Sequence, residues 1–503
     1  MTNPLYDALI APQIDRAAPL LLTDGAEISG AGFAAMAHRF AHALVVLGLE
    51  PGDRMAVQIQ KSPAALALYG AALAAGVVFL PLNTAYTPDE VAYFVENSGA
   101  VLLVCDPSAS ESLGPVAAHH GAAMQTLDGT GDGSLALLAA EQPDSFDPVE
   151  RGRDDLAAIL YTSGTTGRSK GAMLTQANLL DNAQVLVDEW RFTADDVLLH
   201  MLPIFHTHGL FVASNVSLLS GGRMIFLPGF SVERALRWLP RATSMMGVPT
   251  FYTRLLNDSR FDRALTGHMR LFTSGSAPLL AETHRQFQAR TGHRILERYG
   301  MTETNMSTSN PYDGERRAGT VGFPLPGVEL KITDPGTGAE LPQGTPGMIE
   351  VRGHNVFKGY WQMPEKTAEE LRADGFFITG DIGVIDADGY VSIVGRQKDL
   401  IISGGYNIYP KEIELVLDEQ PGVLESAVIG VPHPDFGEAV VAVIVPEAGA
   451  EVTAPALEAA IAPSLARFKQ PKRYEIIPEL PRNTMGKVQK NLLREQFRDS
   501  FTG

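Results

Sequence analysis

Short apolar runs alternate with amphipathic stretches over the first half of the chain. Two stretches have the spacing and composition of helices, residues 33–47 and 63–75. Five runs have those of short buried strands: residues 54–59, 101–105, 197–202, 224–227 and 244–247. Strands that alternate with helices are typical of parallel sheets covered by helices on both faces. We therefore predict an α/β fold for residues 25–260.

The pattern changes twice further along. Residues 318–395 contain short strands separated by turns, which predicts a small β-rich module. After Gly395 a helix is expected to begin at Pro410, where the missing proline N–H costs no hydrogen bond. Strands at 424–431 and 440–445 and a short helix complete an α+β pattern. We predict a large N-terminal domain, residues 1–395, and a small C-terminal domain, residues 396–503.

Residues 64–82 are uncharged and long enough to raise the question of a membrane span. Nearly half of them are Ala or Gly, and Gly76 is followed at once by a β-branched, strand-like run. We expect a buried helix that ends at Gly76, followed by a strand. The first ten residues lack a basic segment before an apolar one, so we expect no signal peptide.

Composition excludes several classes of protein. The chain has 503 residues, of which 45% are hydrophobic and 19% charged, which is ordinary for a globular protein. The net charge is −18, so the chain lacks the basic character of nucleic-acid binders and would be repelled by an anionic membrane. We therefore expect no nucleic-acid or membrane partner. Cys105 is the only cysteine, so no internal disulfide can form, and we predict a reducing, cytoplasmic location.

The strongest local motif is the glycine-rich segment 161–171, directly after the apolar run 156–160. Its Gly, Ser and Thr residues allow backbone N–H groups and hydroxyls to surround phosphate oxygens, and Lys170 adds a positive charge. It is not a Walker A loop, because Ser169 precedes the lysine and Gly171 follows it. The alternative is a surface turn rich in small polar residues.

Weaker polar clusters follow in order. They are Tyr299 to Glu303, Thr379 to Asp381, Gly395 to Lys398, Ser403 to Tyr406, and a late lysine, Lys487, after a glycine. Taken singly, each also fits an ordinary turn or surface group. In this order and spacing, with the segment 161–171, they resemble the acyl-adenylate-forming ligases, which include acyl-CoA synthetases, luciferases and adenylation domains of peptide synthetases. The resemblance covers residues 20–495.

The resemblance implies a mobile C-terminal lid and two half-reactions. A carboxylic acid and ATP first give an acyl-AMP and pyrophosphate, and the thiol of CoA then displaces AMP. Lys487 is implied to lie where negative charge gathers in the first transition state, and charge-directed groups are usually the largest catalytic term. Rotation of the lid about Lys398 would withdraw Lys487 and bring in a loop for CoA: Ser403, Gly404, Gly405 and Tyr406.

The other roles implied by the resemblance concern the nucleotide. Glu303 and Thr165 would bind Mg²⁺, Tyr299 would stack on adenine, and Asp381 with Arg396 would bind the ribose. The phosphates would be held by Thr162, Ser163, Gly164, Thr165, Thr166, Gly167 and Lys170. The remaining implied ATP or AMP contacts are Ser276, Ala277, Glu297, Arg298, Gly300, Met301, Thr302 and Lys398.

Segments that the resemblance assigns to the acyl pocket carry two arginines, Arg254 and Arg298. A buried guanidinium without a counter-anion costs about 3–5 kcal/mol. A second carboxylate on a short substrate would be that anion, because Arg can bind it in a bidentate manner. The pocket segments also resemble malonyl-CoA synthetases, which take malonate and methylmalonate. Further pocket residues are Thr207, Ser274, Gly275 and Met306.

His206 is grouped with Lys487 and Glu303 among the catalytic residues, although we expect His206 and His208 to orient the pocket rather than to act as bases. Two histidines without a third ligand do not make a zinc site. A further hypothesis is that a lysine acetyltransferase and a deacetylase act on Lys487.

Several alternatives stay open. One arginine could pair with a protein carboxylate, Glu297 or Asp258, although Glu297 should face away from Arg298. The substrate could be acetate, propionate or oxalate. A peptide-synthetase adenylation domain would normally be followed by a carrier domain, and the printed sequence ends at Gly503. A non-catalytic nucleotide sensor is disfavoured, because binding alone does not require Lys487.

Overall fold

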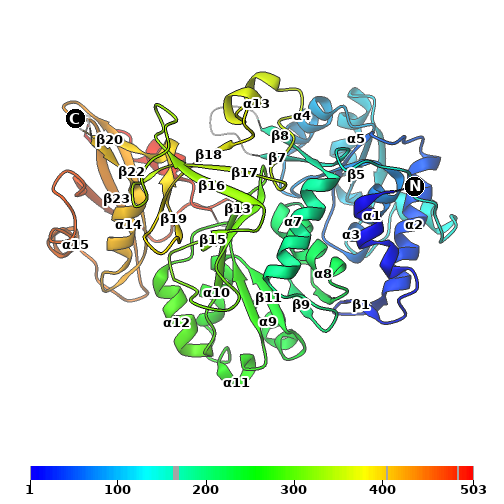
Figure 1. Cartoon of the computed structure of the whole chain (residues 1–503), viewed down its shortest axis with the longest axis horizontal. Coiled ribbons are helices and arrows are strands. Elements are labelled where there is room, and N and C mark those ends of the chain that lie inside the picture. The colour runs from blue at the N-terminus through cyan, green and yellow to red at the C-terminus, as the bar shows by residue number, and fades with distance from the viewer. Residues whose placement is uncertain (1, 163–168, 404–405, 484–486, 502–503) are drawn as a thin grey trace.

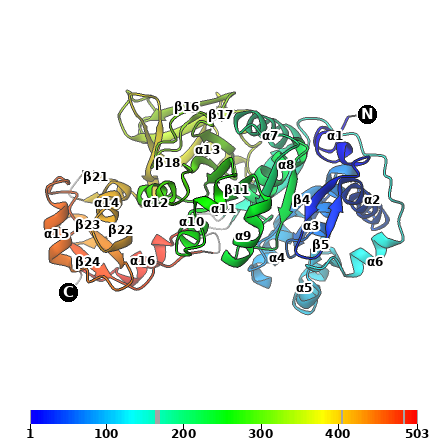
Figure 2. The same ribbon diagram turned by 90° about the horizontal axis from the view of Figure 1, so that it is seen from below.

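A computed structural model describes residues 2–162, 169–403, 406–483 and 487–501. In these ranges the strands form four sheets. Figures 1 and 2 place the chain's N-terminal elements at one end of an elongated molecule and its C-terminal elements at the other. No helix in the described ranges is long and apolar enough to cross a membrane.

The first sheet has the strand order β6-β5-β3-β4-β7-β8 and is parallel except for the β7–β8 hairpin. Its strands are β3 (Arg54–Gln58), β4 (Val78–Pro81), β5 (Leu102–Cys105), β6 (Ala123–Thr126), β7 (Leu156–Thr162) and β8 (Lys170–Thr175). The helices of this region are α1 (Pro4–Leu9), α2 (Gly30–Val46), α3 (Pro63–Ala75), α4 (Pro88–Ser98), α5 (Ser110–His119) and α6 (Ser134–Ala140). The hairpin pairs Thr162 with Lys170, so both ends of the glycine-rich segment are fixed at a sheet edge.

Helix α3 explains the uncharged stretch. Ser62 caps its N-terminus, Pro63 occupies the first turn, and Gly76 ends it in the left-handed conformation at φ 70° before β4 begins. Residues 64–75 are all buried, because α3 packs against α2 on one side and its own sheet on the other. The predicted buried helix, glycine stop and strand are confirmed.

The second sheet has nine strands in the order β15-β14-β13-β12-β11-β9-β10-β1-β2. They are β1 (Pro19–Leu22), β2 (Glu27–Ser29), β9 (Val197–His200), β10 (Arg223–Phe226), β11 (Ser244–Gly247), β12 (Leu271–Ser274), β13 (Leu296–Met301), β14 (Asn305–Ser309) and β15 (Phe323–Pro324). Its helices are α7 (Gln176–Glu189), α8 (Asn215–Leu219), α9 (Val232–Trp238), α10 (Pro249–Leu256), α11 (Arg263–Thr266) and α12 (Ala281–Thr291), with a π-helix at His208–Ser214. Strands β9, β11, β12 and β13 are parallel neighbours, so their carboxyl ends lie at one edge.

The predicted β-rich module is an antiparallel four-stranded sheet, β16 (Val328–Thr333), β17 (Gly347–Gly353), β18 (Phe377–Ile385) and β19 (Val391–Arg396), with α13 (Pro364–Glu370). The fourth sheet uses only residues after 400: β20 (Ile401–Ser403), β21 (Tyr406–Ile408), β22 (Val423–His433), β23 (Gly437–Pro446) and β24 (Arg473–Ile476). Helices α14 (Pro410–Asp418), α15 (Ala454–Ile461) and α16 (Lys490–Gln496) accompany it and share its apolar core. Helix α14 begins at Pro410, as predicted.

Candidate active site

Lys170, at the start of β8, faces two acidic side chains. Its Nζ lies 3.0 Å from both carboxylate oxygens of Glu370 and 3.0 Å from the Tyr360 hydroxyl. The same hydroxyl is 2.6 Å from Glu370 and 3.0 Å from Oε1 of Glu303. Glu303 is buried, and burial raises its pKa. The structure thus joins Lys170 and Glu303, as expected, through two residues that the sequence did not single out as site residues.

The predicted ribose site is a second cluster of polar groups. The Tyr299 hydroxyl donates to Asp381 at 2.7 Å, and Nε of Arg396 lies 2.9 Å from the other Asp381 oxygen. Antiparallel pairing of β18 with β19 sets Asp381 directly opposite Arg396. Burial of the Tyr299 ring raises its pKa, and the neighbouring Asp381 raises it further. These three predicted residues therefore lie together.

Lys487 comes from the C-terminal region, yet its charge acts inside this site. The Lys487 residue is exposed overall, although its ammonium is surrounded by protein, and its backbone N–H donates to the Asn483 side chain at 3.0 Å. Burial of the ammonium lowers the pKa of Lys487; Arg396 and Lys398 lower it further, whereas Asp381 and Glu303 raise it. His206 lies close enough for Lys487 to lower its pKa as well. The C-terminal region thus brings Lys487 close to the N-terminal site in this structure.

Lys398 lies in a short 3₁₀ turn, Gln397–Asp399, between β19 and β20. Its neighbour Asp399 forms an ion pair with Arg494 of α16. Of the predicted CoA loop, Ser403 is buried, and Gly404 and Gly405 lie outside the described residues. Tyr406 is exposed and stacks on Phe468, with ring centroids 4.6 Å apart.

Arg298 on β13 lies in the predicted acyl region; it is only 3% exposed, and its guanidinium packs on Gly275, directly after β12. Its Nε and Nη2 atoms have no hydrogen-bond partner among the described residues, while a Cβ on Gly275 would lie 2.1 Å from Nη1. Burial lowers the pKa of Arg298 to about 9, so the guanidinium is still charged at pH 7. A buried and unpaired guanidinium is a binding position for an anion.

The segment 206–208 lies against the same region. Nδ1 of His208 is 3.2 Å from the Ser276 hydroxyl, and the Thr207 hydroxyl donates to Asn305 at 3.0 Å. Ser276 and Asn305 both have positive φ, at 69° and 46°, which is uncommon for residues other than glycine and concentrates at functional sites. Within the part of the chain that the structure describes, other buried polar atoms here also have no partner: Nε2 of His206, Nε2 of His208, Oγ of Ser274 and Nδ2 of Asn305.

Arg254 was expected to be buried in the acyl pocket, but its side chain is exposed. Helix α10 buries Tyr252 and Leu255, so Arg254 faces outward and its guanidinium lies 5.3 Å from the centroid of Phe230. The expectation of two buried guanidinium groups is therefore wrong for Arg254 and correct for Arg298.

The carboxylates considered as alternative partners are engaged elsewhere. Asp258 pairs with Arg260. Glu297 lies 3.4 Å from His284 and accepts from the Gly319 N–H, so it is engaged away from Arg298, as expected. Among the described residues, neither Arg254 nor Arg298 forms an ion pair.

Other predicted residues take up the turns around the site. Gly300, Met301 and Thr302 lie at the β13–β14 turn, and a Cβ on Gly300 would lie 1.7 Å from the Asn305 carbonyl oxygen. Met306 is buried on β14, and Ala277 follows β12. Thr162 and Lys170 end β7 and begin β8. Residues Ser163, Gly164, Thr165, Thr166 and Gly167 lie outside the described ranges.

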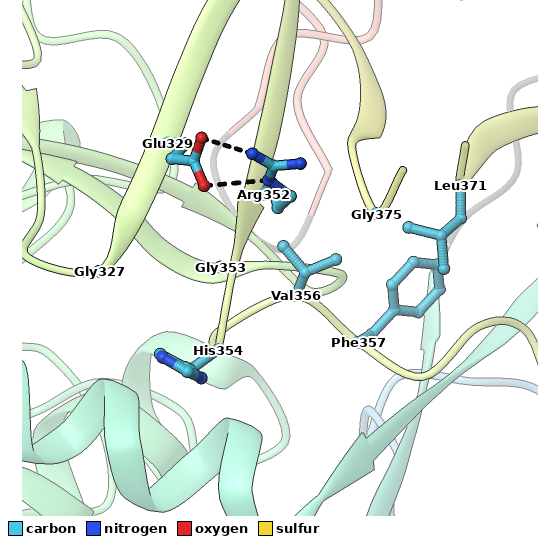
Figure 3. A pocket seen from close by; sticks show the side chains of 9 residues that line it. All are labelled: Gly327, Glu329, Arg352, Gly353, His354, Val356, Phe357, Leu371 and Gly375. Carbon is cyan, nitrogen blue, oxygen red and sulfur yellow. Dashed lines mark hydrogen bonds and ion pairs between the residues drawn. The ribbon is translucent and has the colours of Figure 1, made fainter. Parts of the chain in front are cut away.

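A cavity of about 420 Å³ in the β-rich module is lined by Phe357, whose N–H donates to the Glu303 carbonyl, and by eight other residues that were not predicted as site residues (Figure 3). Glu329 and Arg352 on its wall bind each other through two hydrogen bonds, of 3.0 and 2.6 Å. None of the residues around it was predicted to take part in chemistry.

Comparison with known proteins agrees with this geometry. Residues 10–361 match the family model "AMP-binding enzyme", and residues 412–487 match its C-terminal domain. The chain belongs to the AMP-binding enzyme family. Members of this family include a malonate–CoA ligase of Arabidopsis thaliana, 38% identical over 84% of this chain and 74% of the relative. A feruloyl-CoA synthase of an Amycolatopsis species is 37% identical over 91% and 92%.

The family member MatB from Rhodopseudomonas palustris is 57% identical in sequence, with full coverage of both chains. Its ATP-bound crystal structure superposes with a TM-score of 0.97 and its apo structure with 0.87. The arrangement of domains in this chain is therefore nearer to that of the ATP-bound relative.

Proposed function

We propose that this chain is a malonyl-CoA synthetase, which converts malonate, ATP and CoA to malonyl-CoA, AMP and pyrophosphate through malonyl-AMP. The single observation that supports the choice of acid is the buried guanidinium of Arg298, whose Nε and Nη2 have no hydrogen-bond partner in residues 2–162, 169–403, 406–483 and 487–501. The second carboxylate of malonate supplies the missing anion, whereas acetate would use its only carboxylate in the reaction. The malonate–CoA ligase activity named for the Arabidopsis relative supports the same choice.

The unpaired polar atoms around Arg298 suit an acid with two carboxylates. Nε2 of His206 and His208, Oγ of Ser274 and Nδ2 of Asn305 can each direct a hydrogen bond to a carboxylate oxygen. Met306 and Thr207 limit the length of the acid. We propose Arg254 as a second hydrogen-bond donor to the acid. Burial gives no support for this role, because an exposed guanidinium requires no counter-anion.

Malonyl-AMP formation joins a carboxylate oxygen to the α-phosphorus of ATP and breaks its bond to the pyrophosphate oxygen. Lys487 stabilises the charge that gathers between the two anions, because its ammonium lies among the groups of the N-terminal site. Lys170 and the segment that begins at Thr162 hold the outgoing phosphates, Asp381 and Arg396 the ribose, and Tyr299 the adenine.

Glu303 is suited to hold Mg²⁺. Its carboxylate is a hard oxygen ligand next to Lys170, and the phosphates would provide further oxygens. The ion supplies positive charge to the phosphates. Thr165 is proposed as a further ligand.

The second half-reaction would require a different orientation of the C-terminal domain. We place the domain boundary between residues 395 and 396 and the hinge at Lys398, which is supported by a C-terminal sheet built only from residues after 400. Rotation there would remove Lys487 and present Ser403, Gly404, Gly405 and Tyr406 to CoA. The CoA sulfur would then attack the acyl carbon and release AMP.

Three finer assignments belong to the same proposal. Methylmalonate is a second substrate, because one methyl group changes binding by only about 1–3 kcal/mol. Acetylation of Lys487 would remove the charge that the first step needs. A cytoplasmic location fits a single cysteine, Cys105, that is buried and unpaired.

The test is to incubate the purified protein with ATP, Mg²⁺ and CoA, together with malonate, methylmalonate, acetate or butyrate, and to identify products by mass spectrometry. Malonyl-CoA and AMP, with little acetyl-CoA, are expected. Acetyl- or butyryl-CoA as the main product would refute the role of Arg298 while leaving the reaction type intact. No thioester from any acid would refute the proposed reaction.

A further inference from the structure

Lys61 is a buried lysine outside all the motifs described above. It lies between β3 and α3, and its backbone is fixed because the next residue, Ser62, caps α3 through the Ala65 N–H. Only 6% of Lys61 is exposed, and its Nζ lies 4.2 Å from the centroid of the Phe226 ring. Lys61 and Phe226 also line a second cavity, of about 550 Å³. A lysine is almost never buried without a specific set of partners.

The partners of Lys61 belong to the end of β9. Its Nζ lies 2.8 Å from the His200 carbonyl oxygen, 2.9 Å from the Leu202 carbonyl oxygen and 2.9 Å from Nδ1 of His200. All three positions are 139 to 141 residues away in sequence. Lys61 therefore ties the first sheet's β3–α3 loop to the point where β9 leads into the segment 203–209.

His200 continues the connection toward the acyl region. Its Nε2 is 2.9 Å from the Gly209 carbonyl oxygen, which can only accept, so Nε2 carries the ring proton. Burial lowers the pKa of His200 and keeps the ring neutral, which leaves Nδ1 without a proton. Nδ1 and the two carbonyl oxygens then all accept from Lys61. These three contacts can use every proton that Lys61 carries when it is charged, while burial lowers its pKa well below the usual value.

The Gly209 carbonyl lies in the first turn of the π-helix His208–Ser214. The Gly209 carbonyl oxygen also accepts from the Ser214 hydroxyl at 2.9 Å. The hydroxyl oxygen of Ser214 is in turn 3.1 Å from Nε2 of His200. Two side chains thus hydrogen-bond the Gly209 carbonyl within the π-helix. A Cβ on residue 209 would lie 1.9 Å from the Pro203 carbonyl oxygen, so the turn is also closely packed.

We propose that Lys61 is a positioning residue for the acid: through His200 it fixes the Gly209 carbonyl and hence His206, Thr207 and His208. Residue 208 begins the π-helix, and Thr207 and His208 are held on their other side by Asn305 and Ser276. Releasing the Gly209 carbonyl moves these side chains relative to Arg298. The nucleotide groups, Asp381 and Arg396, lie on β18 and β19 and do not share these contacts.

The inference rests on the proposed function only for the choice of acid. The experiment is malonate-dependent exchange of pyrophosphate into ATP, which measures the first half-reaction alone. Lys61→Met keeps the approximate length of the side chain and removes its hydrogen-bond donors. It is expected to raise KM for malonate about tenfold and to change KM for ATP less than about twofold, because buried hydrogen bonds are lost at the acid side only.

Lys358→Met is the matched control, since Lys358 is exposed and donates to a single carbonyl, that of Asp154. It should behave like the wild type. If Lys61→Met does not fold, Ser214→Ala removes one hydroxyl from the same connection and should raise KM for malonate about two- to threefold. Alkylation of a Lys61→Cys variant with 2-bromoethylamine rebuilds a lysine analogue through the second cavity, while Cys105 is buried; it should restore KM.

An unchanged KM for malonate in folded Lys61→Met would overturn the inference. An equal rise in KM for both substrates would also overturn it, because general loosening of the fold would then explain the effect. Absence of malonate-dependent exchange in the wild type would instead refute the proposed function.

Discussion

The guanidinium of Arg298 packs so closely on Gly275 that a Cβ at position 275 would lie 2.3 Å from Cζ of the arginine. Real side chains do not tolerate such a distance, and Arg298 is buried, so it has little room to move. The absence of a side chain at Gly275 is therefore part of how Arg298 is placed.

Gly275→Ala should lower kcat/KM for malonate about tenfold or more, because the added methyl group displaces the guanidinium. KM for ATP should change little. Steady-state kinetics with each substrate varied in turn would measure both. Gly229→Ala is the control, since no atom lies within 4 Å of a Cβ at that position. Equal kinetics of the two variants would contradict the close packing.

Arg298→Met should lower kcat/KM for malonate about 10²–10³-fold, which corresponds to roughly 3–4 kcal/mol for leaving one partner of a buried charge pair alone. The measurement is malonyl-CoA formation at varied malonate. Arg254→Ala is the comparison: its exposed guanidinium makes a smaller loss the expected result. A larger loss in Arg254→Ala than in Arg298→Met would reverse the assignment of the main carboxylate ligand.

Lys487→Ala should abolish formation of malonyl-AMP yet still convert supplied malonyl-AMP and CoA to malonyl-CoA. The reason is that Lys487 acts on charge that develops only in the first step. The two activities are measured separately, by pyrophosphate exchange and by thioester formation from the adenylate. Equal loss of both would show that the substitution damages the site as a whole.

Stability should fall as the pH is lowered from 7 to 4, in part through His206. Burial lowers the pKa of His206 to about 3, against about 6.5 for an unfolded histidine. The unfolded state therefore binds more protons between these values, so the contribution is complete above pH 6.5 and is lost as the pH falls toward 3. Thermal unfolding of the wild type and of His206→Gln at pH 7, 6 and 5 should show a smaller decrease in the variant. Parallel curves would refute this contribution.

Sequence alone predicted the parts of the site that lie within short segments. Thr162 ends β7 and Lys170 begins β8, Glu303 lies between β13 and β14, and Asp381 pairs with Arg396 across β18 and β19. Pairing between neighbouring strands therefore brings these residues together. The α/β fold, the buried helix at 63–75 and the β-rich module followed from periodicity and turns.

Contacts between distant segments could not be read from the sequence. Glu370 meets Lys170 across 200 residues, and Lys61 meets His200 across 139. The sequence around Glu370 and Lys61 does not indicate their partners, because those contacts depend on how distant parts of the chain pack together. The exposure of Arg254 was missed for another reason: it depends on the rotation of α10, in which Tyr252 and Leu255 take the buried side.

Lys487 belongs to the C-terminal region but acts on groups of the N-terminal site, and this division has a kinetic consequence. Under the proposed rotation, one lid serves two steps and cannot serve both at once. Each half-reaction proceeds only in one orientation of the lid. Its observed rate is therefore the rate in that orientation multiplied by the fraction of time that the lid spends there. A substitution that holds the lid longer over the adenylate site would speed the first step and slow the second, so turnover peaks where the two occupancies are balanced.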